Sequence, residues 1–346
     1  MLAEDLKSRI RRSGPLSFSN FVEACLYDSE NGFYTKTGRA GRRGDFITSP
    51  EVGPVFGHLI ANWLDQLWTE IQKPKDFQVI EVGAGCGTLA RTILDSEPKC
   101  LESGSYVMVE RSEELRKEHP TSEKLVSTMQ MPEGPIVGAV IANELLDNLP
   151  FDLLEGDGNC WKEVCIDLMD DQFIEILTTE KDPPIEITPL KGARIPVQTQ
   201  SNNWIKDVIE KISKGSILLF DYGSTTQEMS QRHQDSWLRT FKRHFRGDSP
   251  LEDVGNQDVT VEVAIDQLPK GFSISTQKQF LENQGINKLV EEGRKIWEES
   301  SSIGDLKAVK ARSRITEADA LLDPKGLGGF FVFEWKIGSS GAVSEN

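Results

Sequence analysis

With 346 residues, of which 38% are hydrophobic and 27% charged, the chain can bury a sizeable core and has the composition of a globular protein. Its net charge of −16 argues against a broad phosphate-binding surface and so excludes nucleic acid as the main partner. An acidic surface suits a basic, arginine- or lysine-bearing protein, although solubility alone explains it equally well. No apolar run approaches the roughly 18–20 residues that cross a bilayer, so we expect no membrane insertion.

Cysteine and histidine usage gives no sign of a disulfide scaffold or a metal site. The five cysteines include no C-x-x-C pair, and the four histidines lack the spacing of metal ligands, which favours a reducing compartment. The opening MLAEDLKSRIRRSGP has no hydrophobic targeting segment, and its early Glu4 and Asp5 disfavour a transit peptide. We therefore expect a cytoplasmic protein, or a mitochondrial matrix protein only if a targeting segment is missing from this chain.

Residues 1–75 are predicted to form a mostly helical N-terminal segment. A first helix is indicated by apolar residues at helical spacing, Leu2, Leu6 and Ile10. Further helices are expected over 18–26 and over 56–71. Before the last of these, the loop GDFITSPE is rich in hydroxyl groups and backbone donors. Its Thr48 and Ser49 belong either to a ligand-binding loop or to an ordinary helix N-terminus, and the residues alone favour neither.

The segment QVIEVGAGCGT, residues 78–88, is the most informative of the chain. An apolar strand runs into three closely spaced glycines, Gly83, Gly85 and Gly87. A dinucleotide fingerprint would place its third small residue at Thr88, one residue later than here. The G-x-G-x-G form, with Glu81 two residues before it, suits S-adenosylmethionine, which has no phosphates and carries a sulfonium cation. Taken alone, the motif is equally typical of a tight turn without a ligand.

The next strand supports a nucleoside-type cofactor. The apolar run Tyr106–Val109 ends in Glu110, about 20 residues past the glycine turn. A carboxylate at this point is placed to accept hydrogen bonds from both ribose hydroxyls. The alternative is a solvated glutamate at a strand end.

Residues 76–223 alternate as a doubly wound α/β sheet does. Strands are predicted at 77–83, 106–110, 124–128, 136–142 and 216–221, with helices after the first, second and fourth. An insertion separates the last two strands. Its alternating pattern around Asp170 and Asp171 predicts a β-hairpin at about 160–180, followed by a helix over 202–213.

The fourth strand ends in NELLDNLP, across the crevice in which open parallel sheets bind ligands. Asn143 is expected to cap a one-turn helix, and Glu144 and Asp147 to share one face of it. Two carboxylates and an amide at the sulfonium end of a cofactor suit a cationic nucleophile. The acids are equally typical of a helix N-terminus, where they are favourable electrostatically.

The remaining chain is expected to contain a helical or loop-rich cap over 224–300, which serves a protein partner or covers the cofactor. Two strands, 307–315 and 328–337, are then predicted to complete the sheet within residues 301–337, and 338–346 to form a frayed tail.

Several of these segments resemble, in order, the motifs of the MidA family. They are GPLSFSNFVEACLYDSENGFY, GDFITSPEVGPVFGHLIANW, EVGAGCGTL, NELLDNLP, LLFDYG, LRTFKRH, DVTVEV and TQKQFLENQGI, and they cover roughly residues 6–337. The chain departs from the family at Ala84, where proline is usual, and at Leu145 and Leu146, where two phenylalanines are frequent. The leucines change the aromatic lining expected on the substrate side.

The resemblance implies a Rossmann-like class I methyltransferase with a mostly parallel seven-stranded sheet and an antiparallel C-terminal strand. It also implies an N-terminal helical segment, an inserted helical cap, and S-adenosylmethionine as methyl donor. The implied acceptor is a protein arginine, since mitochondrial members of the family methylate an arginine of a respiratory complex I subunit. The implied cofactor residues are Gly83, Gly85, Gly87 and Glu110, with Thr48 and Ser49 nearby. The implied substrate-facing residues are Asn143, Glu144 and Asp147.

Two other functions stay open on the sequence. A cofactor-binding assembly or scaffold protein with little transferase activity would use its acidic surface and residues 224–300 for docking. A nicotinamide dehydrogenase is disfavoured by Thr88 in the third small-residue position and by the lack of a histidine pair for hydride transfer.

Overall fold

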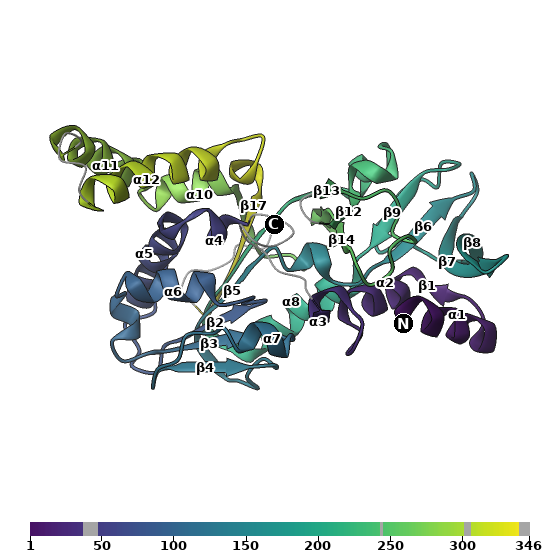
Figure 1. Ribbon diagram of the computed structural model, residues 1–346, viewed down its shortest axis with the longest axis horizontal. Coiled ribbons are helices and arrows are strands. Elements are labelled where there is room, and N and C mark those ends of the chain that lie inside the picture. Colours follow the sequence, from purple (N-terminus) through teal and green to yellow (C-terminus); the bar gives the residue numbers. More distant parts are fainter. Residues whose placement is uncertain (37–47, 243–244, 301–305, 339–346) are drawn as a thin grey trace.

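A seven-stranded sheet forms the centre of one lobe of the molecule (Figure 1). The computed structural model describes residues 1–36, 48–242, 245–300 and 306–338. In sheet order, the strands are β16 (Ser273–Thr276), β17 (Phe331–Ile337), β10 (Ile212–Asp221), β5 (Ile136–Asn143), β2 (Gln78–Val82), β3 (Ser105–Val109) and β4 (Leu125–Thr128). The five strands from β10 to β4 are parallel, and β17 runs antiparallel to β10. The predicted Rossmann-like α/β fold is therefore confirmed.

Helices cover both faces of this sheet because successive residues of each central strand point to opposite sides. In β2, Val79 packs with α5 (Pro54–Glu70) and α6 (Thr88–Asp95). Its neighbour Ile80 packs on the other face with α8 (Thr199–Lys211). The chain passes from β2 outwards to β4 and then returns to β5 on the other side of β2. This reversal of direction leaves a crevice beyond the carboxyl ends of β2 and β5.

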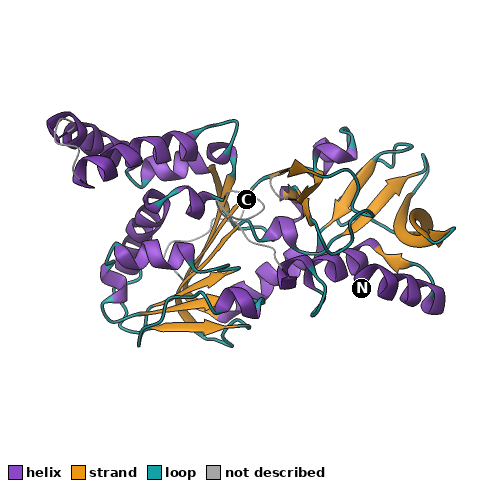
Figure 2. Ribbon diagram, in the orientation of Figure 1, coloured by secondary structure: helices purple, strands orange, loops and turns teal. Residues whose placement is uncertain are grey.

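The second lobe is built on a sheet that the N-terminal helices cover (Figure 2). Its strands are β1 (Leu16–Ser17), β6 (Asp152–Gly156), β7 (Trp161–Met169), β8 (Gln172–Glu180) and β9 (Arg194–Val197). The hairpin expected around 160–180 is present as β7 and β8, and Met169 pairs with Gln172 across a two-residue turn. Helix α1 (Leu2–Ser13) precedes β1 in the chain, and α2 (Phe18–Tyr27) and α3 (Phe33–Lys36) follow it, before the other strands of this sheet.

Residues 224–300 were expected to be helical or loop-rich, and their first half consists mostly of loops with several short strands. Strands β12 (Leu238–Lys242), β13 (Phe245–Arg246) and β14 (Asp258–Val261) form a small sheet. Next to it, β11 (Gly223–Ser224) pairs with β15 (Val263–Ala264), and α9 (Thr226–Ser230) lies between them in sequence. The helices α10 (Gln277–Asn283) and α11 (Ile286–Ser300) lie in the second half of the region.

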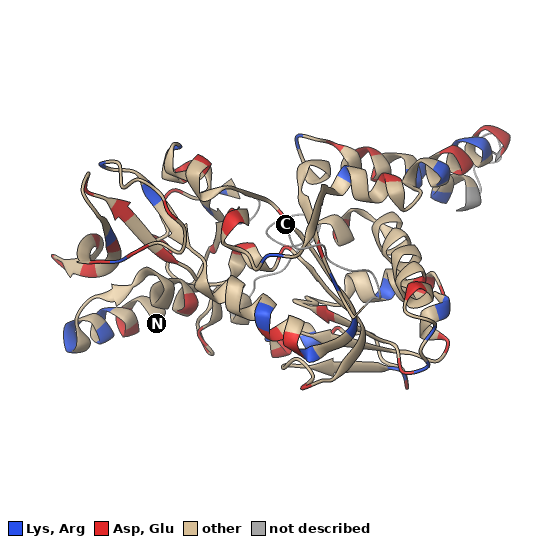
Figure 3. Ribbon diagram, turned by 180° about the vertical axis from the view of Figure 1, so that it is seen from behind, with Lys and Arg blue, Asp and Glu red and all other residues tan. Residues whose placement is uncertain are grey.

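The strand predicted over 307–315 is wrong, because these residues lie within helix α12 (Leu306–Leu322). Its buried residues, Ala308, Ala311, Ala318 and Leu321, recur at helical spacing. The antiparallel neighbours of β17 are β10 and β16 instead. Together, α10, α11 and α12 form an arm beside the central sheet, along which acidic and basic residues are interspersed (Figure 3).

The remaining helical elements are short. They are α4 (Ser49–Val52), α7 (Glu113–Arg116), and 3-10 helices at Lys99–Leu101, Leu146–Asn148 (η2), Gln234–Ser236, Ile265–Gln267 and Leu327–Gly329. Within the described residues, no helix has the length and apolar character needed to cross a membrane.

A buried carboxylate of the arm contacts the core. Glu317 of α12 accepts a hydrogen bond from the backbone N–H of Val55 at 3.0 Å and so caps α5 from outside its own segment. Gly53 permits this approach, because a Cβ there would lie 2.2 Å from the Glu317 carboxyl carbon.

We predict that Glu317→Ala lowers the free energy of unfolding by about 1 kcal/mol, because it leaves a buried backbone donor of α5 without a partner. Urea unfolding followed by circular dichroism measures the change. Asp319→Ala, an exposed acid on the same helix, is the matched control and should be neutral. Equal stability of the two variants would contradict the capping role.

Candidate cofactor and acceptor site

A cavity of about 1000 Å³ opens at the carboxyl ends of β2, β3 and β5. It has the size of a pocket for a cofactor or a drug-sized ligand. The glycine turn, the end of β3 and the segment after β5 line it, and the N-terminal segment closes one side with Tyr27 and Tyr34. The crevice expected from the order of the strands is therefore a single pocket shared by core and N-terminal residues.

The glycine turn has a backbone that side chains would strain. Gly83, Gly85 and Gly87 have φ angles of 71°, 55° and 80°, all in the left-handed region that favours glycine. The backbone N–H groups of Gly83 and Ala84 both donate to the carbonyl of Val109, which fixes the turn to β3. Gly83 and Gly85 line the cavity, whereas Gly87 precedes α6 as its N-cap residue.

A buried histidine holds the turn from behind. His119 Nε2 lies 2.8 Å from the carbonyl oxygen of Gly85, and Nδ1 lies 2.8 Å from Ser127 Oγ. A carbonyl can only accept, so Nε2 carries the hydrogen and Nδ1 accepts from the serine hydroxyl. Burial lowers the pKa of His119, which keeps the ring neutral in this role. Among the described residues, no group of three potential metal ligands occurs.

Glu110 lies at the edge of the cavity with both carboxylate oxygens partly used. Oε2 accepts from the Gly85 N–H at 3.0 Å, and Oε1 accepts from the Ser112 N–H at 2.8 Å. Each carboxylate oxygen has a second lone pair, so the group keeps the capacity to accept two hydroxyl hydrogens. Burial raises its pKa, against the effect of these two N–H groups. The residues present therefore fit a nucleoside with a free ribose.

Glu81 also lines the cavity, but its carboxyl group is buried. Its Oε2 accepts from the Tyr106 hydroxyl at 2.8 Å. Burial raises the pKa of Glu81 to about 8, although the Tyr106 hydrogen bond acts in the opposite direction. A cation in the cavity would favour its charged form.

The loop before α4 contributes in two different ways. Thr48 lines the cavity as expected. The hydroxyl of Ser49 is fully buried and donates to Gln277 Oε1 at 2.8 Å, so it faces the helical arm instead of the cavity. The backbone N–H of Ser49 is directed at the carboxylate of Glu144 and helps to lower its pKa. Residues 44–47 of this loop lie outside the described chain.

The expected helix with Glu144 and Asp147 on one face is absent, because Glu144 still belongs to the end of the sheet. Its backbone N–H donates to Phe220 of β10 at 2.8 Å, and its φ of 51° is left-handed. Only then does η2 begin, and Asn143, the last residue of β5, does not cap it. A left-handed glutamate is uncommon and is typical of functional sites. The turn brings Asn143 Nδ2 to 2.9 Å from Glu144 Oε1, and both residues line the cavity.

Asp147 lies behind this wall within a cluster of buried acids that also contains Asp221 and Asp258. Asp147 accepts from the Tyr222 hydroxyl at 2.8 Å, and Asp221 accepts from the backbone N–H of Leu146 at 2.9 Å. Burial raises the pKa of Asp147 to about 7 and those of Glu144 and Asp258 to about 8. In the part of the chain that the structure describes, none of the four carboxylates forms an ion pair.

Sequence reasoning missed the aromatic and acidic residues that distant segments bring to this site. Tyr27 and Tyr34 stack with ring centroids 5.6 Å apart, and Tyr34 bonds to Asn148 and Asp258. In the sequence, the two tyrosines belong to a stretch rich in turn-forming residues, which gave no indication of a role in the site. Asp258 was visible only within the DVTVEV motif, without a role.

The buried acids predict how stability depends on pH. Since the pKa of Asp258 is about 8 when folded and near 4 when unfolded, the folded protein binds more protons between these values. The free energy of unfolding therefore falls as pH rises. Asp258→Asn removes this effect, so its stability relative to the native chain should increase from pH 5 to pH 8 by about 1 kcal/mol per pH unit. Urea titrations at several pH values measure it, and a constant difference would contradict it.

Comparison with known proteins places this site in a family. A family model described as "Putative S-adenosyl-L-methionine-dependent methyltransferase" matches residues 59–281, more than half of the chain. The mitochondrial protein arginine methyltransferase NDUFAF7 homolog of Drosophila melanogaster is 28% identical over 302 residues, covering 76% of this chain and 68% of that protein. Human NDUFAF7, also named mitochondrial, is 25% identical over 333 residues, covering 82% and 73%. These names do not support the expected cytoplasmic location.

Solved structures agree with the fold. A COG1565 superfamily member from Burkholderia thailandensis, bound to S-adenosyl-homocysteine, has a TM-score of 0.81 at 24% identity and covers 99% of this chain and 93% of its own. The family match confirms the resemblance stated from the motifs and the predicted cofactor, S-adenosylmethionine. It also removes the dehydrogenase alternative. The chain thus belongs to the MidA family of S-adenosylmethionine-dependent methyltransferases.

Proposed function

We propose that this methyltransferase modifies the guanidinium group of a protein arginine, that Glu144 binds that group, and that Asp147 acts on it electrostatically from behind the cavity wall. The observation that carries the proposal is the buried acidic cluster at the end of β5, which has no cationic partner among the described residues. A buried carboxylate without a partner is costly, and a bound cation relieves that cost. Arginine supplies a cation that stays charged at every physiological pH.

Chemistry at this site requires orientation more than acid strength. The cofactor, when bound, supplies a methyl group on a positively charged sulfur. Glu144, in the cavity wall, would hold the guanidinium and leave one nitrogen free to attack, with Asp147 drawing positive charge toward the other nitrogens. As the new N–C bond forms and the S–C electron pair stays on sulfur, a nitrogen-bound proton must leave. The raised pKa of Glu144, about 8, suits it as the first acceptor of that proton.

The cofactor roles assigned from the sequence remain part of this proposal. Gly83 and Gly85 would allow the nucleoside to approach the backbone, and Gly87 would let α6 begin directly after the turn. Glu110 would accept from the ribose, while Glu81 and Thr48 would face the amino-acid part and the sulfonium. Ser49 would act through its backbone N–H on Glu144.

The names of the relatives support arginine as the acceptor and mitochondria as the compartment, since the fly and human proteins are named mitochondrial protein arginine methyltransferases. A respiratory complex I subunit, which the family resemblance implies, is the first acceptor to test. Methylarginine mass spectrometry of cells with and without this chain would identify the acceptor. An unchanged methylarginine proteome would favour the assembly or scaffold role instead.

We predict that Glu144→Gln lowers the rate of methyl transfer by at least about 100-fold, because it removes a charge that contacts the acceptor cation. The dissociation constant of S-adenosylhomocysteine should stay within about twofold, since the change is isosteric. Single-turnover transfer and calorimetry measure the two quantities. Glu186→Gln, at an exposed position, is the control. Parallel loss of binding and transfer would count against an acceptor role.

We also predict that Gly85→Ala weakens S-adenosylhomocysteine binding by roughly tenfold or more, because a methyl group then enters the cavity wall. Gly192→Ala is a matched control. Both glycines have positive φ angles, 55° and 79°, and a Cβ at either meets nothing within 4 Å. Each substitution should cost about 1–2 kcal/mol of stability, but only the one at Gly85 should affect binding. Equal affinity of the two variants would refute the assignment.

A further inference from the structure

Asp258 reaches the acceptor side of the site from the insertion between β10 and β16. It is the first residue of β14 and pairs with Phe241 of β12. Asp258 is more than 100 residues away from η2 along the chain. Its Oδ1 accepts from Asn148 Nδ2 at 3.0 Å and from the Tyr34 hydroxyl at 3.2 Å. Both of these partners line the cavity, and Asp258 lies directly behind them.

The polar hydrogens of these wall residues bond to other protein groups and not to the cavity. Asn148 Nδ2 donates to Asp258 Oδ1 and, at 3.4 Å, to the carbonyl of Val259, which uses both amide hydrogens. The single hydroxyl hydrogen of Tyr34 is shared between Asp258 Oδ1 and Asn148 Oδ1. The Tyr27 hydroxyl donates to the carbonyl of Asn148 at 3.2 Å. What these groups have left to offer a ligand is oxygen lone pairs.

Further oxygens on the same side have no donor. Asp258 Oδ2, Asp147 Oδ1 and Asn143 Oδ1 are buried without a hydrogen-bond partner in the described chain. Asp258 and Asp147 are only 1% and 3% exposed, and the charge of each disfavours ionisation of the cluster. A buried acceptor without a donor is costly, so this arrangement favours a bound group that donates hydrogen bonds.

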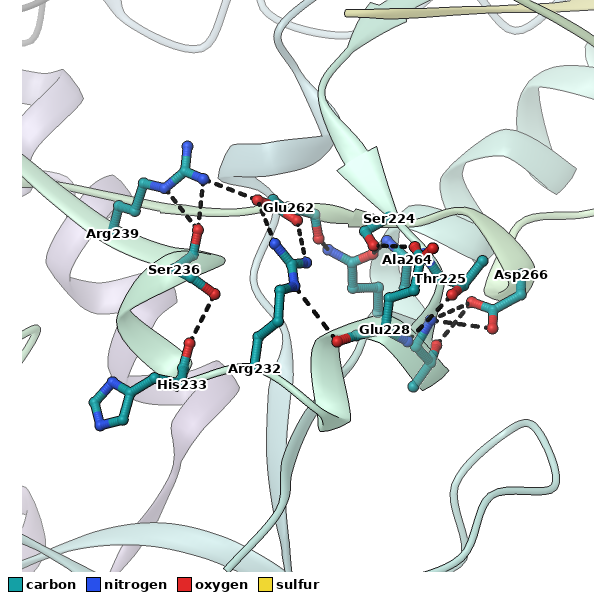
Figure 4. Close-up of polar contacts among 12 residues, drawn as sticks. Ser224, Thr225, Glu228, Arg232, His233, Ser236, Arg239, Glu262, Ala264 and Asp266 are labelled. Carbon is teal, nitrogen blue, oxygen red and sulfur yellow. Dashed lines mark hydrogen bonds and ion pairs between the residues drawn. The ribbon is translucent and has the colours of Figure 1, made fainter.

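The basic side chains near Asp258 are bound elsewhere. Arg232 and Arg239 both pair with Glu262, at 2.6 Å and 2.8 Å (Figure 4). Lys242 pairs with Asp253 at 3.0 Å. On the N-terminal side, Arg111 pairs with Glu23 and lies 4.3 Å from the ring centroid of Tyr27. The described cations of this region therefore leave Asp258 without a partner.

We propose that Asp258 is a specificity-determining residue of the acceptor site, which makes the wall of Tyr34 and Asn148 an acceptor of hydrogen bonds and so selects a guanidinium over a neutral isostere. This inference rests on the proposed function. A guanidinium has five N–H donors and no acceptor, which matches such a wall. The ureido group of citrulline has the same shape but turns a carbonyl oxygen toward it. Two acceptors would then face each other.

The test compares two probes, a short peptide with one arginine and the same peptide with citrulline. Their affinities are measured by calorimetry on the full chain saturated with S-adenosylhomocysteine. The native protein should prefer arginine. Asp258→Asn should reduce the arginine-to-citrulline affinity ratio by roughly tenfold or more, because the asparagine amide can donate into the wall and the charge is lost. Affinity for S-adenosylhomocysteine should be unchanged.

Asp266→Asn is the matched control. This acid belongs to the same insertion but accepts from the N–H and hydroxyl of Thr226, and it does not line the cavity, so the ratio should not change. Tyr34→Phe is a second variant that removes the shared hydroxyl, and it should lower the ratio several-fold. If Asp258→Asn fails to fold, the affinity ratio of Tyr34→Phe tests the proposal in its place.

The outcomes separate the two claims. A native protein that binds both probes equally would overturn the proposed arginine function, whatever Asp258 does. A native preference for arginine that survives in a folded Asp258→Asn protein, or in Tyr34→Phe if the first does not fold, would overturn this inference alone.

Discussion

The acids gathered at the ends of β5 and β10 and at the start of β14 are the constraint on which the rest of the site depends. Asp147, Asp221 and Asp258 lie out of water, Glu144 lines the cavity beside them, and the described chain supplies none of the four with a cation. Backbone N–H groups, the Tyr222 hydroxyl and two asparagine amides bear part of the electrostatic cost. The remainder can be relieved only by protonation or by a positively charged ligand. A methyl donor with a sulfonium and an acceptor with a guanidinium both meet that requirement.

Bringing these acids together takes three parts of the chain. The N-terminal helices, β6, β7 and β14 share one hydrophobic core, in which Phe18, Leu153 and Val259 are buried together. This core packs against the end of the methyltransferase sheet and so carries Tyr34 and Asp258 to the cavity. The second lobe is therefore part of the site. Its packing determines which side chains face the acceptor, while the sheet determines where the cofactor turn lies.

Stability and function oppose each other at this point. A folded protein that holds several acids with pKa values of about 7 to 8 gives up stability at neutral pH to keep a site that suits a cation. Well-formed caps and ion pairs elsewhere offset that cost. Glu317 on α5 and Glu262 between Arg232 and Arg239 are examples in which burial is matched by donors. In the acceptor wall, formed by Tyr34 and Asn148 with Asp258 behind them, buried oxygens are not matched by donors in this way.

The sequence by itself determined the parallel strands of the sheet, the glycine turn and the family, because local periodicity and a short contiguous motif encode them. Val79 and Ile80 alternate between two faces, and the positive φ angles of the turn require glycine whatever surrounds it. Only the tertiary structure decided the acceptor wall. Glu144 takes a left-handed conformation because its N–H pairs with Phe220, and Asp258 acts through contacts with residues more than 100 positions away. The strand expected over 307–315 became a helix for the same reason, since packing against α5 and α11 outweighed a weak local alternation.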